Sequence, residues 1–180
     1  MNPYHHLAQQ ANYNFMVRAA LVAEYAWAIP NDEAIAAIVG IGKPVIELGA
    51  GNGYWASLIA EAGGTVECWD REPGAHIYEP TGKLWHPVSK GGSEAIGPQH
   101  KGHTLLLVWP PYDKPMGTEC LLQFMKEGGS SLVYVGEGQY GCTADDEFHR
   151  ILDEHWSEER YVCIPQWDGM RDGLSVYRAK

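Results

Sequence analysis

The sequence predicts an α/β fold: a doubly wound, mostly parallel sheet of about seven strands, with helices on both faces and an antiparallel hairpin at the C-terminal edge. Three observations support this prediction. Short apolar runs alternate with segments of helical periodicity along most of the 180 residues. A glycine cluster at 49–53 lies between an apolar run and a helical segment, as in a βαβ unit. The last two expected strands follow each other with no helix between them.

The N-terminal part is expected to hold two helices and then one strand–helix–strand unit. An apolar-rich helical pattern over 12–28 stops at Pro30. A shorter helix follows, with Asn31 or Asp32 as its N-cap and Gly40 as its stop. After these helices we expect a strand at 44–49, a helix at 54–62 and a strand at 65–70.

The rest of the chain continues the alternation until the final pair of strands. The run 103–109 is apolar on both faces, which is typical of a central parallel strand. Thr143, with Asp146 three residues later, resembles a capping box, so a helix is expected from there to about residue 156. The other expected elements are a short strand at 84–88, a helix at 118–126, and strands at 131–136, 161–166 and 174–178.

Length and charge restrict the class of protein. The length fits one domain, 1–180, with a helical cap at 1–40 and an α/β core at 41–180. Nucleic-acid partners are disfavoured, because phosphate binding needs a basic surface and the formal net charge is −10. The longest apolar helical stretch, 15–29, is too short and too charged for a membrane span, and no signal-peptide pattern opens the chain. We therefore expect a cytoplasmic protein that does not bind membranes.

Cysteine and histidine spacings predict neither disulfides nor a metal site. The four cysteines form no CxxC pair. His5 and His6 are adjacent, and His149 and His155 are six residues apart, so neither pair shares one helical face. Free thiols and no bound metal are expected.

The most specific motif is the glycine turn that follows Glu47. Glycines at 49, 51 and 53 allow a tight turn and a close approach of backbone to ligand. The dinucleotide pattern GxGxxG would need a third glycine at Tyr54, and no GxxxxGK[ST] phosphate loop is present. A carboxylate beside the turn would repel a pyrophosphate but suits an ammonium group. Asp70, at the tip of the next expected strand, is placed to accept both hydroxyls of a ribose.

The segment Glu47-Leu-Gly-Ala-Gly-Asn-Gly53, followed by Asp70, resembles the first two motifs of class I methyltransferases that use S-adenosyl-L-methionine (SAM). The resemblance covers essentially residues 30–180, and it implies a Rossmann-like seven-stranded sheet and SAM as cofactor. It places the methionine part of SAM at Glu47 and the glycine turn, the ribose at Asp70 and the adenine near Ser93. The cofactor-binding residues expected on this basis are Glu47, Gly49, Ala50, Gly51, Asp70, Arg71, Ser93, Trp109 and Pro110.

A second motif, Trp109-Pro-Pro-Tyr112, ends the run 103–109. It resembles the [DNS]-P-P-[YFW] motif of methyltransferases that act on exocyclic or amide nitrogens, and it is similar to a variant found in uncharacterised methyltransferase-like proteins. Trp109 cannot accept a hydrogen bond, which argues against methylation of a base amine. The carbonyls of Trp109 and Pro110 remain as acceptors, and we expect Pro111 and Tyr112 beside the methyl acceptor. The alternative is a rigid strand exit with aromatic packing.

Glu137, just after the run 131–136, is the third expected catalytic residue, because a carboxylate at a strand end can orient or deprotonate a nucleophile. It would otherwise be a solvated loop acid. The leading functional hypothesis is transfer of a methyl group from SAM to N or O of a small or medium acceptor, which is a small molecule or a protein. The alternatives are methylation of a nucleic-acid base amine, a non-catalytic SAM-binding module and, more distantly, a nicotinamide or flavin oxidoreductase.

Overall fold

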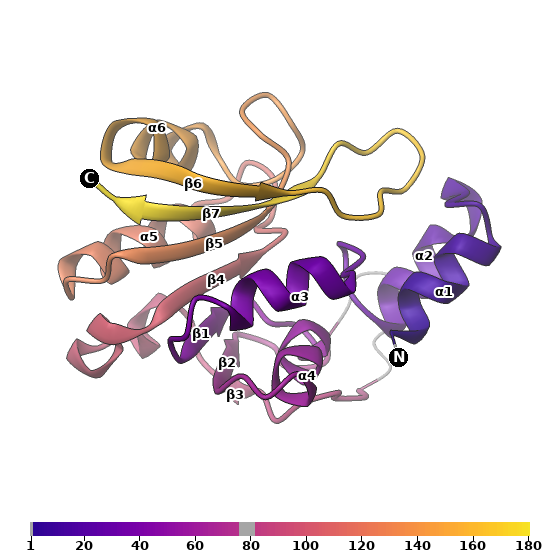
Figure 1. The fold of residues 1–180 in the computed structure, drawn as a ribbon, viewed down its shortest axis with the longest axis horizontal. Helices are drawn as coiled ribbons and strands as arrows, with labels where there is room; N and C mark the ends of the chain where they lie inside the picture. The colour runs from indigo at the N-terminus through magenta and orange to yellow at the C-terminus, as the bar shows by residue number, and fades with distance from the viewer. Residues whose placement is uncertain (1, 76–81) are drawn as a thin grey trace.

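A computed structural model describes residues 2–75 and 82–180, which form a seven-stranded sheet in the order β3-β2-β1-β4-β5-β7-β6 (Figure 1). Neighbouring strands are parallel except where β7 pairs with β5 and β6. The predicted α/β sheet with an antiparallel C-terminal edge is confirmed. The strands are β1 (Val45–Leu48), β2 (Val66–Asp70), β3 (Ser89–Lys90), β4 (Thr104–Val108), β5 (Ser131–Gly136), β6 (Trp156–Val162) and β7 (Gly173–Ala179).

Helices cover both faces of the sheet, so the fold is doubly wound. The helices are α1 (Pro3–Gln10), α2 (Phe15–Glu24), α3 (Asp32–Val39), α4 (Tyr54–Glu61), α5 (Met116–Lys126) and α6 (Asp146–His155), with 3-10 turns η1 (Ser93–Ala95) and η2 (Pro98–Gly102). Within the described part of the chain, no helix is long and apolar enough to cross a bilayer.

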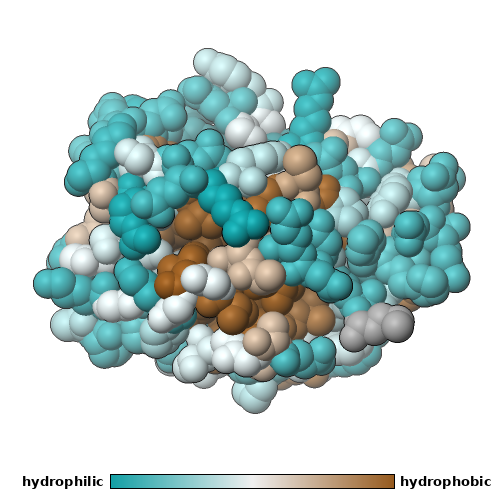
Figure 2. Space-filling model, viewed as in Figure 1, coloured by the Kyte–Doolittle hydropathy of each residue, from teal (hydrophilic) through white to brown (hydrophobic). Residues whose placement is uncertain are grey.

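Strand alternation divides the core between the two faces. Val45 and Leu106 pack with α1, α3 and α4, whereas Ile46 and Leu105 pack with α5 and α6. Figure 2 shows hydrophobic residues gathered in the middle of the face that α1, α3 and α4 cover, around α3. β1 is the switch point, because the chain leaves it toward β2 and β3 and returns beside it as β4.

The N-terminal segment differs from the expected single helix at 12–28. The helix in that range is the shorter α2, and α1 precedes it, separated from it by Asn12 and Tyr13, which both have left-handed backbone angles (φ 51° and 54°). Asn14 then caps α2 by accepting a hydrogen bond from the Met16 amide. The helix was expected, but its bounds were wrong and α1 was missed, because the expectation followed apolar content and overlooked an asparagine turn next to an asparagine cap.

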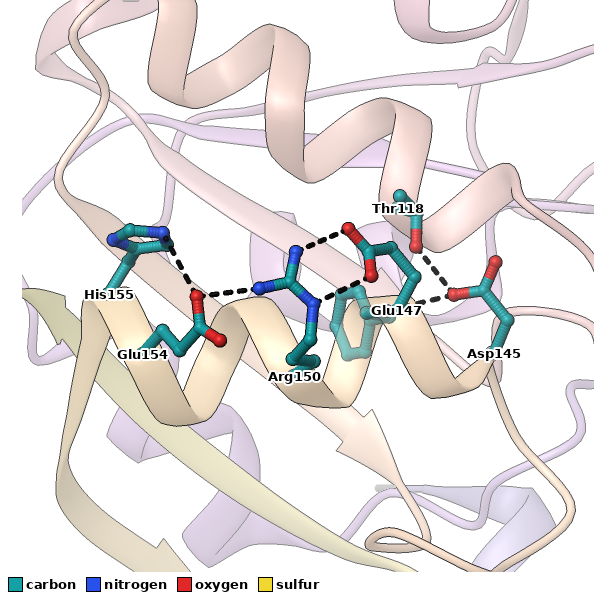
Figure 3. Close-up of polar contacts among 7 residues, drawn as sticks. Thr118, Asp145, Glu147, Arg150, Glu154 and His155 are labelled. Atoms are coloured by element: carbon teal, nitrogen blue, oxygen red, sulfur yellow. Dashed lines mark hydrogen bonds and ion pairs between the residues drawn. The ribbon is translucent and has the colours of Figure 1, made fainter.

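Helix α6 begins later than expected, and its cap is not Thr143. Asp145 is the N-cap, since its side chain accepts from the Phe148 amide and from the Thr118 hydroxyl (Figure 3). Arg150 forms ion pairs with Glu147 and Glu154 along the exposed side of the helix (Figure 3).

Two expected strands lie elsewhere in the structure. Residues 84–88 are not paired in the sheet, and the short strand β3 follows directly after them. The strand expected at 161–166 is β6, which starts at Trp156 immediately after α6. It was misplaced because the middle of β6, residues 157–161, is polar or exposed, as befits the edge of a sheet.

Candidate functional site

A cavity of about 360 Å³ opens at the carboxyl ends of β1, β2 and β4. Its walls come from the glycine turn after β1, the end of β2, the exit of β4, and the C-terminal end of α2 with the segment that follows it. In open α/β sheets, ligands bind at this edge, next to the switch point. The cavity is therefore the candidate functional site.

The glycine turn is held on the end of β2, because the amides of Gly49 and Ala50 both donate to the Trp69 carbonyl. Gly49 and Gly51 have left-handed φ values of 72° and 58°, which glycine adopts without steric cost. A Cβ added at Gly51 would meet nothing within 4 Å, so the turn leaves open space there. Asp70 binds the turn through Oδ2, which accepts from the Gly51 amide at 2.8 Å. Its Oδ1 accepts from the Glu72 amide at 2.8 Å.

Glu47 presents a buried acid to the same cavity. It is 2 % exposed, and among the described residues its Oε2 has no hydrogen-bond partner. Burial, together with the negative charge of Asp70, raises the pKa of Glu47 to about 8, against the lowering effect of a hydrogen bond from the backbone of Ala56. A buried carboxyl without a full set of partners is costly to ionise, so Glu47 would ionise at neutral pH only beside a cation.

The raised pKa of Glu47 has a consequence for stability. We expect the free energy of unfolding of the ligand-free protein to fall from pH 6 to pH 8, because the reference pKa of this group is 4.5 and its folded value is about 8. Over this window the folded state keeps a proton that the unfolded state has lost, so stability declines as pH rises, by about 1.4 kcal/mol per pH unit.

Urea unfolding of the wild type and of Glu47→Gln at pH 6 and pH 8 measures this effect. The stability of the wild type relative to the variant should drop by about 2–3 kcal/mol between the two pH values. Equal pH dependence in both proteins would contradict a protonated Glu47.

The Trp109-Pro-Pro-Tyr112 motif lies at the exit of β4, and one of its two expected carbonyl acceptors already has a hydrogen-bond partner. The Pro110 carbonyl accepts from the Ala144 amide at 2.9 Å, so the strand exit is tied to the loop before α6. The indole Nε1 of Trp109 donates to Asp172 at 3.0 Å. Trp109 also holds a left-handed φ of 50°, which is strained for a bulky side chain and is typical of functional sites.

Glu137 supports loops and does not face the cavity. Its Oε2 accepts from the Cys142 amide and its Oε1 from the Arg171 amide, each at 2.7 Å. Burial alone would raise the pKa of Glu137, but these hydrogen bonds outweigh it and hold the pKa below its ordinary value. Because both oxygens are occupied, the structure does not support the expected role as a base, and Glu137 instead joins the end of β5 to the segment before β7.

The structure brings most of the expected site residues together. Ten of them line the cavity: Glu47, Gly49, Ala50, Gly51, Asp70, Arg71, Ser93, Trp109, Pro110 and Pro111. Among the described residues, Tyr112 and Glu137 do not line the cavity, and the Tyr112 side chain is 65 % exposed. Sequence reasoning missed Met116, Cys120 and Val22, which also line the cavity and carry no motif.

Glu67, His100 and His103 form a cluster that the histidine spacings did not reveal. Their ligand atoms lie within 4.8 Å of one another. The Nδ1 atom of His100 accepts from the Gly97 amide at 3.0 Å, so it carries no proton. The proton is then on Nε2, which donates to Glu67 at 2.6 Å. That nitrogen is not free for a metal, and the contact is a hydrogen bond that joins β2 to η2.

Comparison with solved structures identifies the fold. No protein-family model matches the sequence, and no curated protein matches it significantly. Magnesium protoporphyrin IX methyltransferase (ChlM) of Synechocystis PCC 6803 with bound SAM superposes with a TM-score of 0.60 at 14 % identity, over 93 % of this chain and 85 % of that one. The chain therefore shares the Rossmann-like fold of this methyltransferase.

A second methyltransferase structure shares this fold. The 1,6-didemethyltoxoflavin-N1-methyltransferase of Burkholderia thailandensis, with bound 1,6-didemethyltoxoflavin and S-adenosylhomocysteine, gives a TM-score of 0.53 at 14 % identity, over 83 % of this chain and 77 % of that one. The two methyltransferases act on different acceptors, so the shared fold indicates no acceptor for this chain.

Proposed function

We propose that this protein is a SAM-dependent methyltransferase that acts on N or O of a small or medium acceptor. The observation that carries the proposal is the unpaired, buried Glu47 carboxyl, which lies in the cavity beside the open glycine turn. A carboxyl in this position fits the α-ammonium of an amino-acid cofactor and would repel a phosphate. The fold supports the same proposal, because the chain resembles solved methyltransferase structures that contain SAM or S-adenosylhomocysteine.

The cavity residues suit each part of SAM. Glu47 would hold the ammonium group, and the open backbone of the glycine turn would lie against the methionine part of the cofactor. Asp70 would accept the ribose hydroxyls through oxygens that now bind the Gly51 and Glu72 amides. Ser93 and the neighbouring Gly92 line the remaining part, where the adenine would lie. When bound, SAM supplies an electrophilic methyl group on a positively charged sulfur.

The protein would contribute to catalysis mainly by positioning the cofactor and the acceptor and by excluding water from the cavity. Trp27 and Trp109 close the cavity on the side of α2, and their rings stack at 5.5 Å between centroids. The charged residues in the described lining are Glu47, Asp70, Arg71 and Glu119, none of which lies on the β4 exit or on the segment after α2. The acceptor must therefore bring a nucleophile that loses its proton readily, and orientation accounts for most of the acceleration.

Nucleic-acid base amines are a poor fit for this site. Trp109 offers no side-chain acceptor, and the Pro110 carbonyl is already bound to the Ala144 amide. The net charge of −10 also opposes a polyanion. These features favour a small acceptor over a polynucleotide.

Incubation of the protein with methyl-labelled SAM and a fractionated metabolite extract tests the proposed function. We expect label to move to a small molecule and S-adenosylhomocysteine to form in equal amount, and both to be lost with Glu47→Gln. Tight SAM binding with no S-adenosylhomocysteine formed in any fraction would favour the non-catalytic module and overturn catalysis.

A further inference from the structure

Three contacts hold the indole of Trp109. Its Nε1 donates to Oδ2 of Asp172 at 3.0 Å. Its face stacks on the ring of Trp27, with 5.5 Å between the centroids and 8° between the planes. The guanidinium of the buried Arg18 lies 5.1 Å from the Trp27 centroid and 5.2 Å from that of Trp109. Because both rings line the cavity and neither charged residue does, Arg18 and Asp172 support this wall from behind.

The backbone of Trp109 adopts a conformation that a bulky residue disfavours. Its φ of 50° lies in the left-handed region, and such strain persists only where the surroundings hold the residue in place. The Trp109 amide donates to the Val135 carbonyl at 2.8 Å, which keeps the backbone attached to β5. The contacts of the ring act together with this bond. The strain is therefore offset by contacts whose common result is an indole held at the cavity.

Asp172 is itself held in place just before β7. It is 2 % exposed, and its carbonyl accepts from the Gln166 side chain at 2.6 Å. The preceding amide, that of Arg171, donates to Glu137 at 2.7 Å. Burial raises the pKa of Asp172 to about 6, against the lowering effect of the hydrogen bond from Trp109, so the carboxyl is mostly ionised at pH 7.5. An ionised acceptor binds the indole N–H more strongly than a neutral one does.

We propose that Asp172 is a positioning residue for methyl transfer, and that it acts through Trp109. By accepting the indole N–H it holds the Trp109 ring against Trp27, and the two rings form a flat, uncharged wall for the acceptor end of the cavity. This inference rests on the proposed function, in which Glu47 and Asp70 hold the cofactor and leave the side of the indoles to the acceptor. A displaced ring would misalign the nucleophile of the acceptor, which slows transfer without weakening cofactor binding.

NMR of the tryptophan indole N–H groups tests whether Asp172 holds the ring. The chain has seven tryptophans, and the Trp109 signal is the one that disappears in Trp109→Phe. In the wild type this N–H should exchange with solvent at least about tenfold more slowly than in Asp172→Leu, whose side chain cannot accept a hydrogen bond. Asp172→Asn keeps an acceptor oxygen in nearly the same place, so it should restore slow exchange.

The rate of methyl transfer tests whether the position of the ring matters. With labelled SAM and limiting amounts of the metabolite extract, Asp172→Leu should lower the initial rate at least about tenfold, and Asp172→Asn by no more than about threefold. Calorimetry should find the affinity of both variants for S-adenosylhomocysteine within about threefold of the wild type, because Asp172 does not line the cavity. Exposed Asp168→Asn, in the same segment before β7, is the matched control and should behave as the wild type does.

The possible failures can be told apart. Transfer at the wild-type rate in Asp172→Leu, or unchanged exchange of the Trp109 N–H in that variant, would overturn the positioning role. Where Asp172→Leu does not fold, the wild-type spectrum decides alone, since exchange as fast as in free tryptophan would overturn the role and slow exchange supports it. Failure of the wild type to bind S-adenosylhomocysteine, or binding of SAM with no transfer to any fraction, would instead overturn the proposed function.

Discussion

Replacing Glu47 with Gln is expected to weaken SAM binding at least about 100-fold, because the variant cannot become the anion that pairs with the cofactor ammonium. The carboxyl is 2 % exposed, so little solvent screens such a pair. The amide of Gln has nearly the same shape, which limits changes in packing. Equilibrium dialysis with labelled SAM at pH 7.5 measures the loss.

The pH dependence of the same measurement tests the physical reason. In the wild type, SAM binding should release a proton, because Glu47 is mostly protonated below about pH 8 in the free protein and ionised in the complex. Glu47→Gln should lose this release, and exposed Glu61→Gln should bind as the wild type does. A Glu47→Gln affinity within about threefold of the wild type would contradict the ammonium contact.

Tyr4→Ala is expected to lower the free energy of unfolding by about 3–5 kcal/mol, as large-to-small changes in aromatic cores do. Tyr4 is fully buried and stacks on Tyr25 at 5.0 Å, and its hydroxyl bonds Ala26 and Trp167. Because Tyr25 and Ala26 line the cavity, the same change should weaken SAM binding roughly tenfold by loosening that wall. Urea unfolding and equilibrium dialysis measure the two effects.

Tyr4→Phe provides the matched control. It keeps the ring but loses the hydroxyl, so it should cost only about 1–3 kcal/mol. If Tyr4→Ala cost less than about 1 kcal/mol and left SAM binding unchanged, α1 would not support the cavity.

The cofactor side of the site could be predicted from the sequence because its signals are local. The glycine turn, Glu47 and the acid at the tip of the next strand follow one another along the chain, and strand topology then fixes their place. The doubly wound sheet was predictable for a similar reason, since each strand and helix carries its own apolar period.

The surroundings of Trp109 could not be predicted, because the side chains that contact one another there come from distant parts of the chain. Trp27 comes from the segment after α2, Trp109 from the exit of β4 and Asp172 from the residue before β7, with no sequence spacing to connect them. The hydrogen-bond partners of Glu137 could not be predicted for the same reason. Its position at a strand end was correct, but the Arg171 amide that occupies one of its oxygens lies 34 residues away. Burial and hydrogen-bond partners decide whether an acid is reactive or structural, and neither can be predicted from the neighbouring residues in the sequence.

Calorimetric titration of the wild type with S-adenosylhomocysteine is the most direct test of the central claim, that the cavity beside Glu47 is built for an adenosyl amino acid. We expect one molecule to bind per chain with a dissociation constant in the micromolar range, about −8 kcal/mol. No heat at any temperature or pH at which circular dichroism shows a folded chain, together with no rise in melting temperature at roughly millimolar ligand, would contradict the claim.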